Sequence, residues 1–354
     1  MDYYPGCRLH QIGPYIGKIR PSLARQLVLD HSSGGDWVWD PFCGSGTVPL
    51  ECRLLGRNVV ASDVNPYACA LTRAKLHAPR SLDNCLAQLN KAALSRESHS
   101  GTGDIAPKWV LDFFHEQTLR EIKSIASHFI RRRQYFHMGC LLSILHHQRP
   151  GFLSYPASHL VPYLRNKRFP RERYPEAYEY RDPIPRLESK IIRTLSFPPP
   201  PPITRFTVLQ RSVIHRYLPS ESIDTIITSP PYMNALDYAR DNRLRLWLLG
   251  VEDFRTVKQR EIGKINTFGS DMAITLRIMT DVLKPGGTCI LVLGDVRHSS
   301  RSYNVPSMIL DLVNIYAPAL VLENQWSDTI PDRHRSRRNG RATRQESVMI
   351  FRRV

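Results

Sequence analysis

Five consecutive residues, Thr228-Ser229-Pro230-Pro231-Tyr232, carry side chains suited to holding a planar amine. They follow Ile223–Ile227, an apolar run with β-branched residues that predicts a buried strand. Two prolines end that strand, because neither donates a backbone hydrogen bond and both fix φ near about −65°. The Ser229 hydroxyl and a proline carbonyl can take the two protons of an exocyclic amine, while Tyr232 stacks on its ring. The alternative is a plain Pro-Pro turn that closes the strand.

A glycine-rich turn follows another predicted strand, Asp36–Trp39, and reads Asp40-Pro41-Phe42-Cys43-Gly44-Ser45-Gly46-Thr47. Its glycines allow backbone N–H groups to approach a ligand closely. Thr47 is the expected N-cap of the next helix, and Pro49 suits the first turn of that helix. Because proline occupies the place of a third glycine, the dinucleotide-binding fingerprint is not met. A generic tight turn is the alternative.

The second strand of this predicted unit, Val59–Asp63, ends on an acidic residue. A carboxylate at a strand tip about 20 residues after such glycines is placed to accept hydrogen bonds from ribose hydroxyls. Asp63 fits that role, and Val64 would then lie near the adenine. Asp63 also fits a second role as the N-cap of the helix that begins near Pro66, and the two roles are compatible.

Both motifs resemble those of one enzyme family. The octet at 40–47 resembles the S-adenosylmethionine-binding motif of DNA and RNA methyltransferases. Ser-Pro-Pro-Tyr resembles the catalytic motif of the amino-directed DNA methyltransferases, with serine typical of the cytosine-N4 branch. The resemblance implies that the catalytic residues are Ser229, Pro230, Pro231 and Tyr232. It implies a cofactor site of Lys18, Arg20, Asp40, Pro41, Phe42, Gly44, Ser45, Gly46, Thr47, Asp63 and Val64.

Lys18 and Arg20 enter that set because they precede a predicted helix at Pro21. The family carries a similar basic segment over the methionine end of the cofactor, although a plain amphipathic helix is the alternative. In one place the chain departs from the family. After the predicted strand Phe206–Leu209 it has Gln210-Arg211-Ser212, where relatives place Gly-Asp-Ser or similar. Recognition of the adenine is therefore left open.

The order of the elements predicts an α/β fold, a doubly wound, mostly parallel Rossmann-like sheet. An Asn-Gly turn near Arg338–Arg341 predicts a terminal antiparallel hairpin. Three segments are expected: 1–80 as the cofactor-binding part of the core, 81–204 as an inserted helical and irregular region, and 205–354 as the catalytic part. We interpret the insertion as a target-recognition region.

The charge of the chain indicates a polyanionic partner. Its 354 residues carry a formal net charge of +17, and residues 130–211 hold 15 Lys or Arg against 5 Asp or Glu. Basic residues interleaved with aromatic ones suit phosphate contact and base stacking. The predicted nucleic-acid contacts are Arg131, Arg132, Arg133, Arg165, Lys167, Arg168, Arg240 and Arg243. A solvated basic surface is the alternative.

Other protein classes lack support in the sequence. No stretch reaches the about 18 apolar residues of a membrane span, and the first residues do not resemble a secretory signal. The seven cysteines form no C-x-x-C pair, so neither a metal site nor a disulfide framework is expected. These features predict a cytoplasmic protein.

The resemblance implies site-specific methylation of DNA, with a methyl group moved from S-adenosylmethionine to N4 of a flipped cytosine. Adenine N6 is the first alternative, because its exocyclic amine suits the same loop. An RNA guanine-N2 methyltransferase and a methyltransferase-like protein that binds nucleic acid without catalysis are the others. DNA is the expected partner, and the resemblance leaves open a cognate restriction endonuclease.

Overall fold

The computed structural model describes residues 7–95, 106–196, 204–231, 233, 237–294, 296–298, 301–329 and 345–354. Its contacts divide the chain into two compact units. Unit 1 comprises residues 1–15, 73–201 and 239–255, and unit 2 comprises residues 16–72, 202–238 and 256–354. The unit boundaries thus place 1–15 and 239–255 with the middle of the chain.

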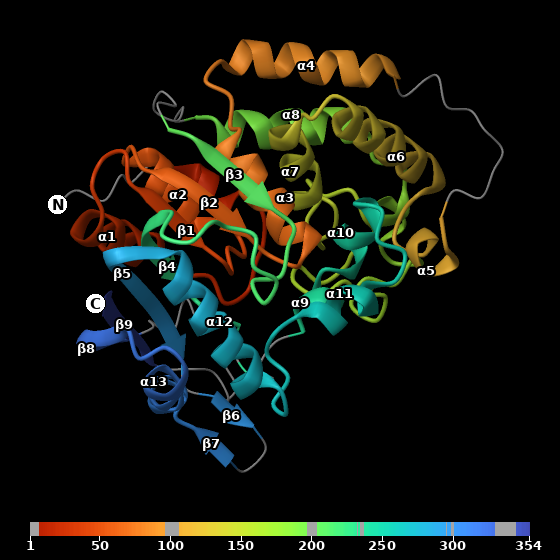
Figure 1. The fold of residues 1–354 in the computed structure, drawn as a ribbon. Coiled ribbons are helices and arrows are strands. Elements are labelled where there is room, and N and C mark those ends of the chain that lie inside the picture. The colour runs from red at the N-terminus through yellow and green to blue at the C-terminus, as the bar shows by residue number, and fades with distance from the viewer. Residues whose placement is uncertain are drawn as a thin grey trace. The chain divides into compact units, whose positions relative to one another are not determined.

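Unit 2 is built on a sheet of seven strands in the order β3-β2-β1-β4-β5-β9-β8 (Figure 1). Five strands run parallel to their neighbours, and β9 pairs antiparallel with both β5 and β8. The strands are β1 Trp37–Asp40, β2 Asn58–Ser62, β3 Phe206–Leu209, β4 Ile223–Thr228, β5 Leu283–Gly294, β8 Leu320–Thr329 and β9 Gln345–Arg353. This arrangement confirms the predicted doubly wound sheet with an antiparallel terminal hairpin. The Asn-Gly turn itself lies outside the described residues.

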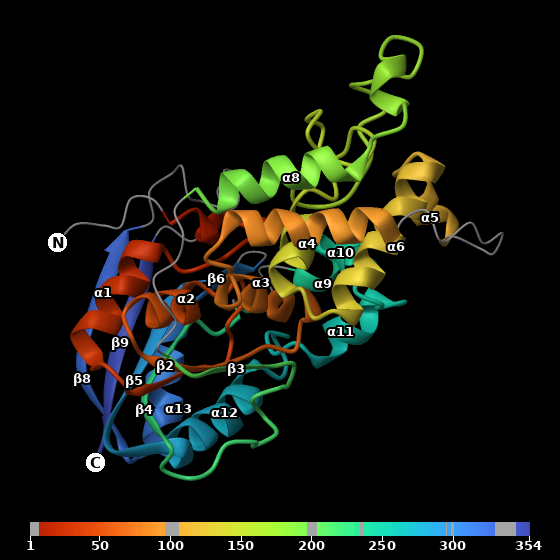
Figure 2. The same cartoon turned by 90° about the horizontal axis from the view of Figure 1, so that it is seen from above.

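Alternate residues of the strands face opposite layers of helices (Figure 2). Val38 and Ile227 face the layer that contains α1 Pro21–His31 and α2 Thr47–Leu54. Trp39 and Ile226, one position away, face the layer of α12 Phe268–Val282 and α13 Val305–Tyr316. Burial on both faces explains why these strands are continuously apolar in sequence rather than alternating.

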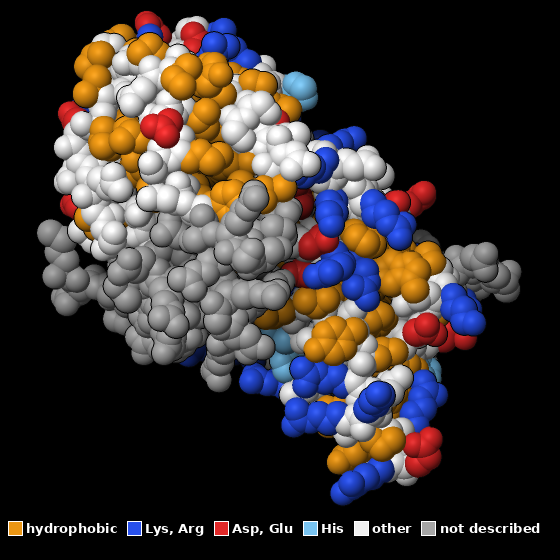
Figure 3. Space-filling view, turned by 90° about the horizontal axis from the view of Figure 1, so that it is seen from below, with side chains coloured by type: hydrophobic (Ala, Val, Ile, Leu, Met, Phe, Trp, Pro, Cys, Tyr) orange, Lys and Arg blue, Asp and Glu red, His pale blue; other side chains and the backbone are white. Residues whose placement is uncertain are grey.

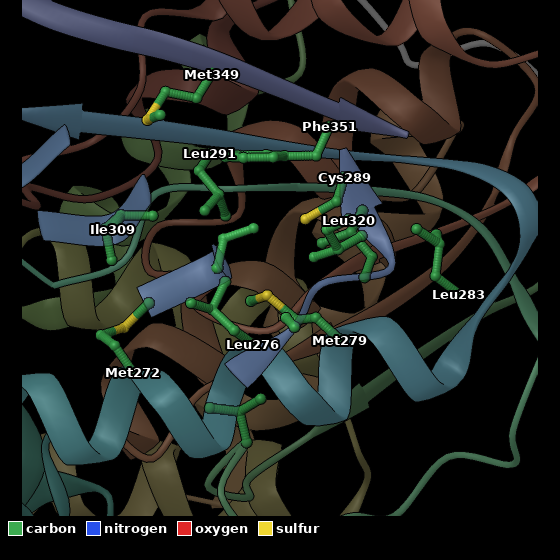
Figure 4. Close-up of a cluster of buried hydrophobic side chains, with 14 of the residues drawn as sticks. Met272, Leu276, Met279, Leu283, Cys289, Leu291, Ile309, Leu320, Met349 and Phe351 are labelled. Carbon is green, nitrogen blue, oxygen red and sulfur yellow. The ribbon is translucent and has the colours of Figure 1, made fainter. Parts of the chain in front are cut away.

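The second of these layers forms the larger core. Figure 4 shows side chains from α12 and α13 meeting those of β5, β8 and β9. Met272, Leu276 and Met279 recur at helical spacing on α12 and are fully buried. This packing fixes the strand β5 beside β4, and so positions the loop that carries Ser229.

Proline and glycine in the sequence mark the ends of several elements, and the observed ends differ from the predicted ones by small amounts. Pro21 is the first residue of α1, as predicted, and Gly56 ends the segment of α2 with a φ of 81°. Thr47 was predicted as an N-cap, but this is wrong: the helix begins at Thr47 and Gly46 caps it. The pairing of β5 with β4 shifts register near Gly286, because Ile223 pairs with Leu283 and Thr225 with Thr288.

Unit 1 is mainly helical. The helices α4 Leu82–Ser95, α6 Glu116–Arg131, α7 Tyr135–Ser143 and α8 Pro183–Thr194 surround an apolar core that includes Leu119, Ile122, Leu141 and Ile191. These helices agree with the helical and irregular region that the sequence predicts between the two parts of the sheet. The shorter elements are η1 Arg8–Gln11, α5 Lys108–Leu111, η3 Pro175–Tyr178 and α10 Arg243–Leu248.

Three helices have sequences that run across the division between units: α3 Pro66–Leu76, α9 Tyr238–Asp241 and α11 Phe254–Arg260. A small separate sheet pairs β6 Val296–His298 with β7 Arg301–Tyr303. The irregular stretch of unit 1 between α7 and α8 is held by buried hydrogen bonds. Arg181 donates to the carbonyls of Phe152, Ser154 and Ala177 there.

Candidate active site at the carboxyl edge of the sheet

The two motifs meet through neighbouring strands. β1 and β4 pair in parallel, so Asp40 at the end of β1 lies beside Thr228 at the end of β4. The Thr228 hydroxyl donates to the Asp40 carboxylate over 2.6 Å. Strand order reverses between these two strands, and open α/β sheets bind ligands at that point.

Asp40 is a buried acid with few partners. It is 3% exposed, and Phe42 also donates its backbone N–H to Oδ1 over 3.3 Å. Burial raises the pKa of Asp40 to about 7, against the opposing effect of the Thr228 and Phe42 hydrogen bonds. The first residue of the glycine-rich turn is thus poised to change charge near neutral pH.

The glycine-rich turn needs glycine at two positions. Gly44 and Gly46 have φ values of 46° and 72°, which L side chains rarely adopt. A Cβ on Gly46 would lie 2.6 Å from the Thr72 hydroxyl oxygen. The backbone therefore passes close to α3, and Gly44 can present its N–H to Asp63.

Asp63 lies directly after β2, at the strand tip that the sequence predicts. Its Oδ2 accepts from the Gly44 N–H over 3.0 Å, and its Oδ1 accepts from the Asn65 N–H over 2.9 Å. Burial raises the pKa of this carboxyl to about 6. Each oxygen retains a lone pair, so the group can still accept hydrogen bonds from a sugar. Asp63 was also predicted as the N-cap of α3, but this is wrong: Asn65 precedes the helix, and its side chain accepts from the Tyr67 N–H over 3.0 Å.

A pocket of about 530 Å³ lies beside Val64, the residue that follows Asp63 at the end of β2. It is lined by Val64, by Gln210, Arg211, Ser212, Ile214 and His215 after β3, and by Gln259 and Arg260 of α11. The Ser212 hydroxyl oxygen is buried and has no hydrogen-bond partner among the residues that the structure describes. A buried, unsatisfied hydroxyl is costly, so a ligand that pairs with it fits this pocket.

These observations fit the nucleoside part of S-adenosylmethionine. Asp63 suits the ribose, while Val64 and the Ser212 hydroxyl suit the adenine. The segment Gln210-Arg211-Ser212, which departs from the family sequence, lies in the pocket itself. No local sequence signal identified this pocket, because its wall joins three segments that are distant in the chain.

Ser229 lies at the carboxyl end of β4. Its hydroxyl donates to the Val292 carbonyl of β5 over 2.9 Å, and Pro230 after it is buried. Tyr232 and residues 234–236 lie outside the described residues. Because the Ser229 hydroxyl already donates to Val292, its oxygen lone pairs remain free to accept a hydrogen bond from a donor such as an amine.

Glu261 is a candidate that sequence reasoning missed. Burial, together with the smaller effects of the nearby Asp63 and Asp237, raises the pKa of this carboxyl to about 7. Lys258 pairs with Asp237 over 2.5 Å. Arg260-Glu261 belongs to no motif, so only the fold brings this acid near Asp63.

The other predicted cofactor residues take varied places. Ser45 and Thr47 are buried, with their hydroxyl oxygens 3.2 Å apart, and Phe42 packs partly buried against the larger core. Lys18 is exposed and Arg20 is half-buried just before α1. Pro41 is buried in the turn.

The predicted nucleic-acid contacts all lie in unit 1. Arg131, Arg132 and Arg133 are exposed at the end of α6, and Lys167 and Arg168 are exposed in the irregular stretch. Figure 3 shows Lys and Arg side chains gathered among hydrophobic ones on one face. Arg165 and Arg243 are half-buried and lie over the rings of Tyr163 and Trp109, and Arg240 is 3.5 Å from Asp241.

Arg245 lies beside the predicted contact Arg243, and its sequence allows either a DNA contact or a surface charge, but the structure gives it another role. It is fully buried and donates to the carbonyls of Leu142 and His159 and to the Asn242 side chain. A surface role for Arg245 is therefore wrong, because the helix α10 turns its side chain into unit 1.

Residues 12–74 match a family described as DNA methylase, the N6/N4 methyltransferase family. This match covers Asp40–Thr47 and Asp63, and it confirms the predicted resemblance to the amino DNA methyltransferases. It also agrees with S-adenosylmethionine as the cofactor. The likeness to that family is thus shown for residues 12–74, which hold the glycine-rich turn and Asp63. Ser229 and its neighbours lie outside the matched residues.

Similar curated proteins match over short segments. The type II methyltransferase M.MjaII of Methanocaldococcus jannaschii is 38% identical over 68 residues, which are 19% of this chain and 13% of that protein. The tRNA (guanine(10)-N2)-dimethyltransferase of Methanothermobacter thermautotrophicus is 42% identical over 63 residues, or 18% of this chain and 19% of that protein. The type II methyltransferase M.XycI of Xanthomonas campestris pv. cyanopsidis is 35% identical over 69 residues, or 20% and 23%. The chain therefore matches less than a quarter of the length of each.

Solved structures give weaker likenesses. TrmN from Thermus thermophilus aligns with a TM-score of 0.40 at 13% identity, over 98% of this chain and 53% of that one. The rRNA methyltransferase aviRa from Streptomyces viridochromogenes has a TM-score of 0.36 at 15% identity, over 98% and 90%. The fold is therefore defined by the strand order of unit 2. No helix in the described ranges is long and apolar enough to cross a membrane.

Proposed function

We propose that this protein methylates the exocyclic N4 of cytosine in DNA, with S-adenosylmethionine as the methyl donor. The observation that carries the proposal is the hydrogen bond between Thr228 and Asp40. It joins the first residue of the cofactor motif to the residue before Ser229, at the edge of the sheet where ligands bind. A DNA substrate would place this activity in the compartment that holds the DNA.

Different residues bind the ribose, the adenine and the methionine end of the cofactor. Asp63 accepts hydrogen bonds from the ribose hydroxyls, and the pocket behind Val64 takes the adenine. Ser212 and Gln210 replace the aspartate that relatives use for the adenine. Lys18 and Arg20 precede α1 and suit the carboxylate at the methionine end. Bound S-adenosylmethionine supplies an electrophilic methyl group on a sulfonium.

The target amine needs activation because its lone pair is conjugated with the ring. A base inside a duplex is out of reach, so the cytosine is flipped out first. The Ser229 oxygen accepts a hydrogen bond from one amine N–H, since its own hydroxyl donates to the Val292 carbonyl. The Pro230 carbonyl accepts the other, and Tyr232 stacks on the ring. These bonds draw the nitrogen toward tetrahedral geometry, and alignment with the methyl group supplies much of the acceleration. A bond from nitrogen to the methyl carbon would form as the carbon–sulfur bond breaks, and the methylated amine would then release one proton to water.

The proposal is tested by methyl transfer from labelled cofactor to DNA and to RNA, followed by digestion and mass spectrometry of the nucleosides. N4-methylcytosine supports it. N6-methyladenine in DNA would keep the mechanism and change the base. Methylated guanine in RNA, which the matching tRNA dimethyltransferase makes a specific alternative, would replace the substrate. Absence of transfer to either would favour a binding protein without catalysis.

The cofactor site gives the first prediction. Asp63→Ala removes the acceptor for the ribose hydroxyls, and S-adenosylmethionine binding should weaken by about 1–3 kcal/mol in calorimetry. Ser212→Ala should weaken it by about 1 kcal/mol, because one hydrogen bond to a neutral group is lost. Ser270→Ala, which removes an exposed hydroxyl of α12 outside this pocket, is the control. Wild-type affinity in Asp63→Ala would remove that residue from the site.

The basic end of α6 gives the second prediction. Replacing Arg131, Arg132 and Arg133 by alanine should weaken DNA binding. The slope of log affinity against log salt concentration should become shallower by about 0.9 for each phosphate that these arginines neutralise in the wild type. Binding measured over a range of salt checks both effects, while calorimetry should show unchanged cofactor affinity. An unchanged salt slope would make this cluster an ordinary solvated surface.

A further inference from the structure

Unit 1 contains a pocket that none of the predicted motifs explains. Its volume is about 690 Å³. Four aromatic side chains line it: the buried Phe113, and Trp109 from α5, Tyr163 from the irregular stretch and Phe254 at the start of α11. The charged side chains Arg243, Asp112 and Glu252 also line it, together with Asp253 and Arg255, which lie 3.8 Å apart as an ion pair. Segments that are distant in sequence thus converge on one hollow within a single unit.

The rings of Trp109, Tyr163 and Phe254 are partly exposed to solvent rather than buried in the hydrophobic core. Tyr163 is 52% exposed, and Trp109 and Phe254 are half-buried. Arg243 holds one ring in place, because its guanidinium lies 5.9 Å from the Trp109 centroid and donates to the Pro162 carbonyl. Exposed aromatic surface in a hollow is a platform for a flat ligand.

The arginines beside the aromatic rings indicate which class of ligand the pocket can bind. Guanidinium groups already lie over the three rings that are open to solvent, with Arg243 on Trp109, Arg165 on Tyr163 and Arg255 on Phe254. A cationic ligand would meet these like charges. A flat, uncharged ring with an attached anion meets aromatic faces and arginines together. That is the chemistry of a nucleotide.

The acids add selectivity for the ring edge. Within the described part of the chain, Asp112 and Glu252 form no ion pair, and both are exposed at the pocket. Ionised carboxylates only accept hydrogen bonds, so they favour bases that carry an exocyclic amine. Thymine offers the O4 acceptor in the same place and is disfavoured.

We propose that this pocket binds an unpaired, amine-bearing nucleobase of the polynucleotide substrate. The inference rests on the proposed nucleic-acid substrate, but not on the methyl transfer itself. Figure 2 shows the yellow-green stretch that carries η3 projecting from α8 and α6. This stretch also brings the exposed cations Lys167 and Arg168, which suit the flanking phosphates.

The test is binding of short single-stranded oligo-dC, oligo-dA and oligo-dT to the full chain without cofactor, by fluorescence anisotropy. Trp109→Ala and Tyr163→Ala should each weaken binding roughly 5- to 100-fold, the effect of removing one base stack. Trp109→Phe keeps an aromatic face and should retain most of the affinity. Tyr316→Ala is the matched control, because Tyr316 is 38% exposed and lies under Arg277 at 5.1 Å in unit 2.

The acids are tested by base preference. Wild type should bind oligo-dC and oligo-dA more tightly than oligo-dT, and the double variant Asp112→Asn/Glu252→Gln should lose that preference. Wild-type binding of all three oligonucleotides by folded Trp109→Ala and Tyr163→Ala would overturn the proposal. So would tighter binding of a trimethylammonium peptide than of oligo-dC. Base binding without methyl transfer would support this pocket and count against the proposed enzyme activity.

Discussion

Ser229→Ala is expected to lower the turnover of methyl transfer by about 100-fold, the effect typical of removing one preorganised hydrogen-bonding group from an active site. The Ser229 hydroxyl is held by the Val292 carbonyl, so its oxygen is oriented before the substrate arrives. Alanine removes the acceptor and leaves the amine conjugated with its ring. Steady-state kinetics with a DNA substrate measure the decrease, and calorimetry should show unchanged cofactor affinity.

Ser222→Ala is the matched control for that experiment. Ser222 immediately precedes the same strand, β4, at its other end, and its hydroxyl donates to the Pro219 carbonyl. Its removal should leave turnover near wild type. Equal decreases in the two variants would indicate that the strand has been disturbed, and normal turnover in Ser229→Ala would exclude the serine from catalysis.

Much of the fold could be predicted because its signals are local. A parallel strand buried on both faces is a short apolar run, and Ile223–Ile227 and Val59–Ser62 have that form. Proline and glycine mark the ends, as at Pro21 and Gly56. Once the strands are known, the parallel arrangement brings their carboxyl ends to one edge. Asp40, Asp63 and Ser229 could therefore be placed there without coordinates.

The rest depends on contacts between distant residues. Nothing beside Glu261 in the sequence indicates that Asp63 and Asp237 lie near it. The burial of Arg245 was missed because an arginine on a short helix is usually solvated, and its partners Leu142 and His159 come from a different part of the chain. The pocket that contains the unpaired Ser212 hydroxyl likewise forms only when the loop after β3 meets α11.

The charge of Asp40 also depends on burial, and it links the site to stability. The pKa of this carboxyl is about 3.8 without burial and about 7 in the folded protein. A group whose folded pKa is raised binds its proton more tightly when folded. Its contribution to stability is therefore complete below about pH 4 and is lost as the pH rises through about 7.

Asp40→Asn should remove that dependence. The amide cannot ionise, and its oxygen can still accept from Thr228, so the hydrogen bond between β1 and β4 is kept. Between about pH 5 and about pH 8 the free energy of unfolding of wild type should fall by about 3 kcal/mol more than that of the variant. Urea unfolding at a series of pH values measures the difference. Glu188→Gln, which removes an exposed carboxyl on α8, should follow wild type. Parallel curves for wild type and Asp40→Asn would mean that Asp40 keeps an ordinary pKa, and that the end of β1 is open to water.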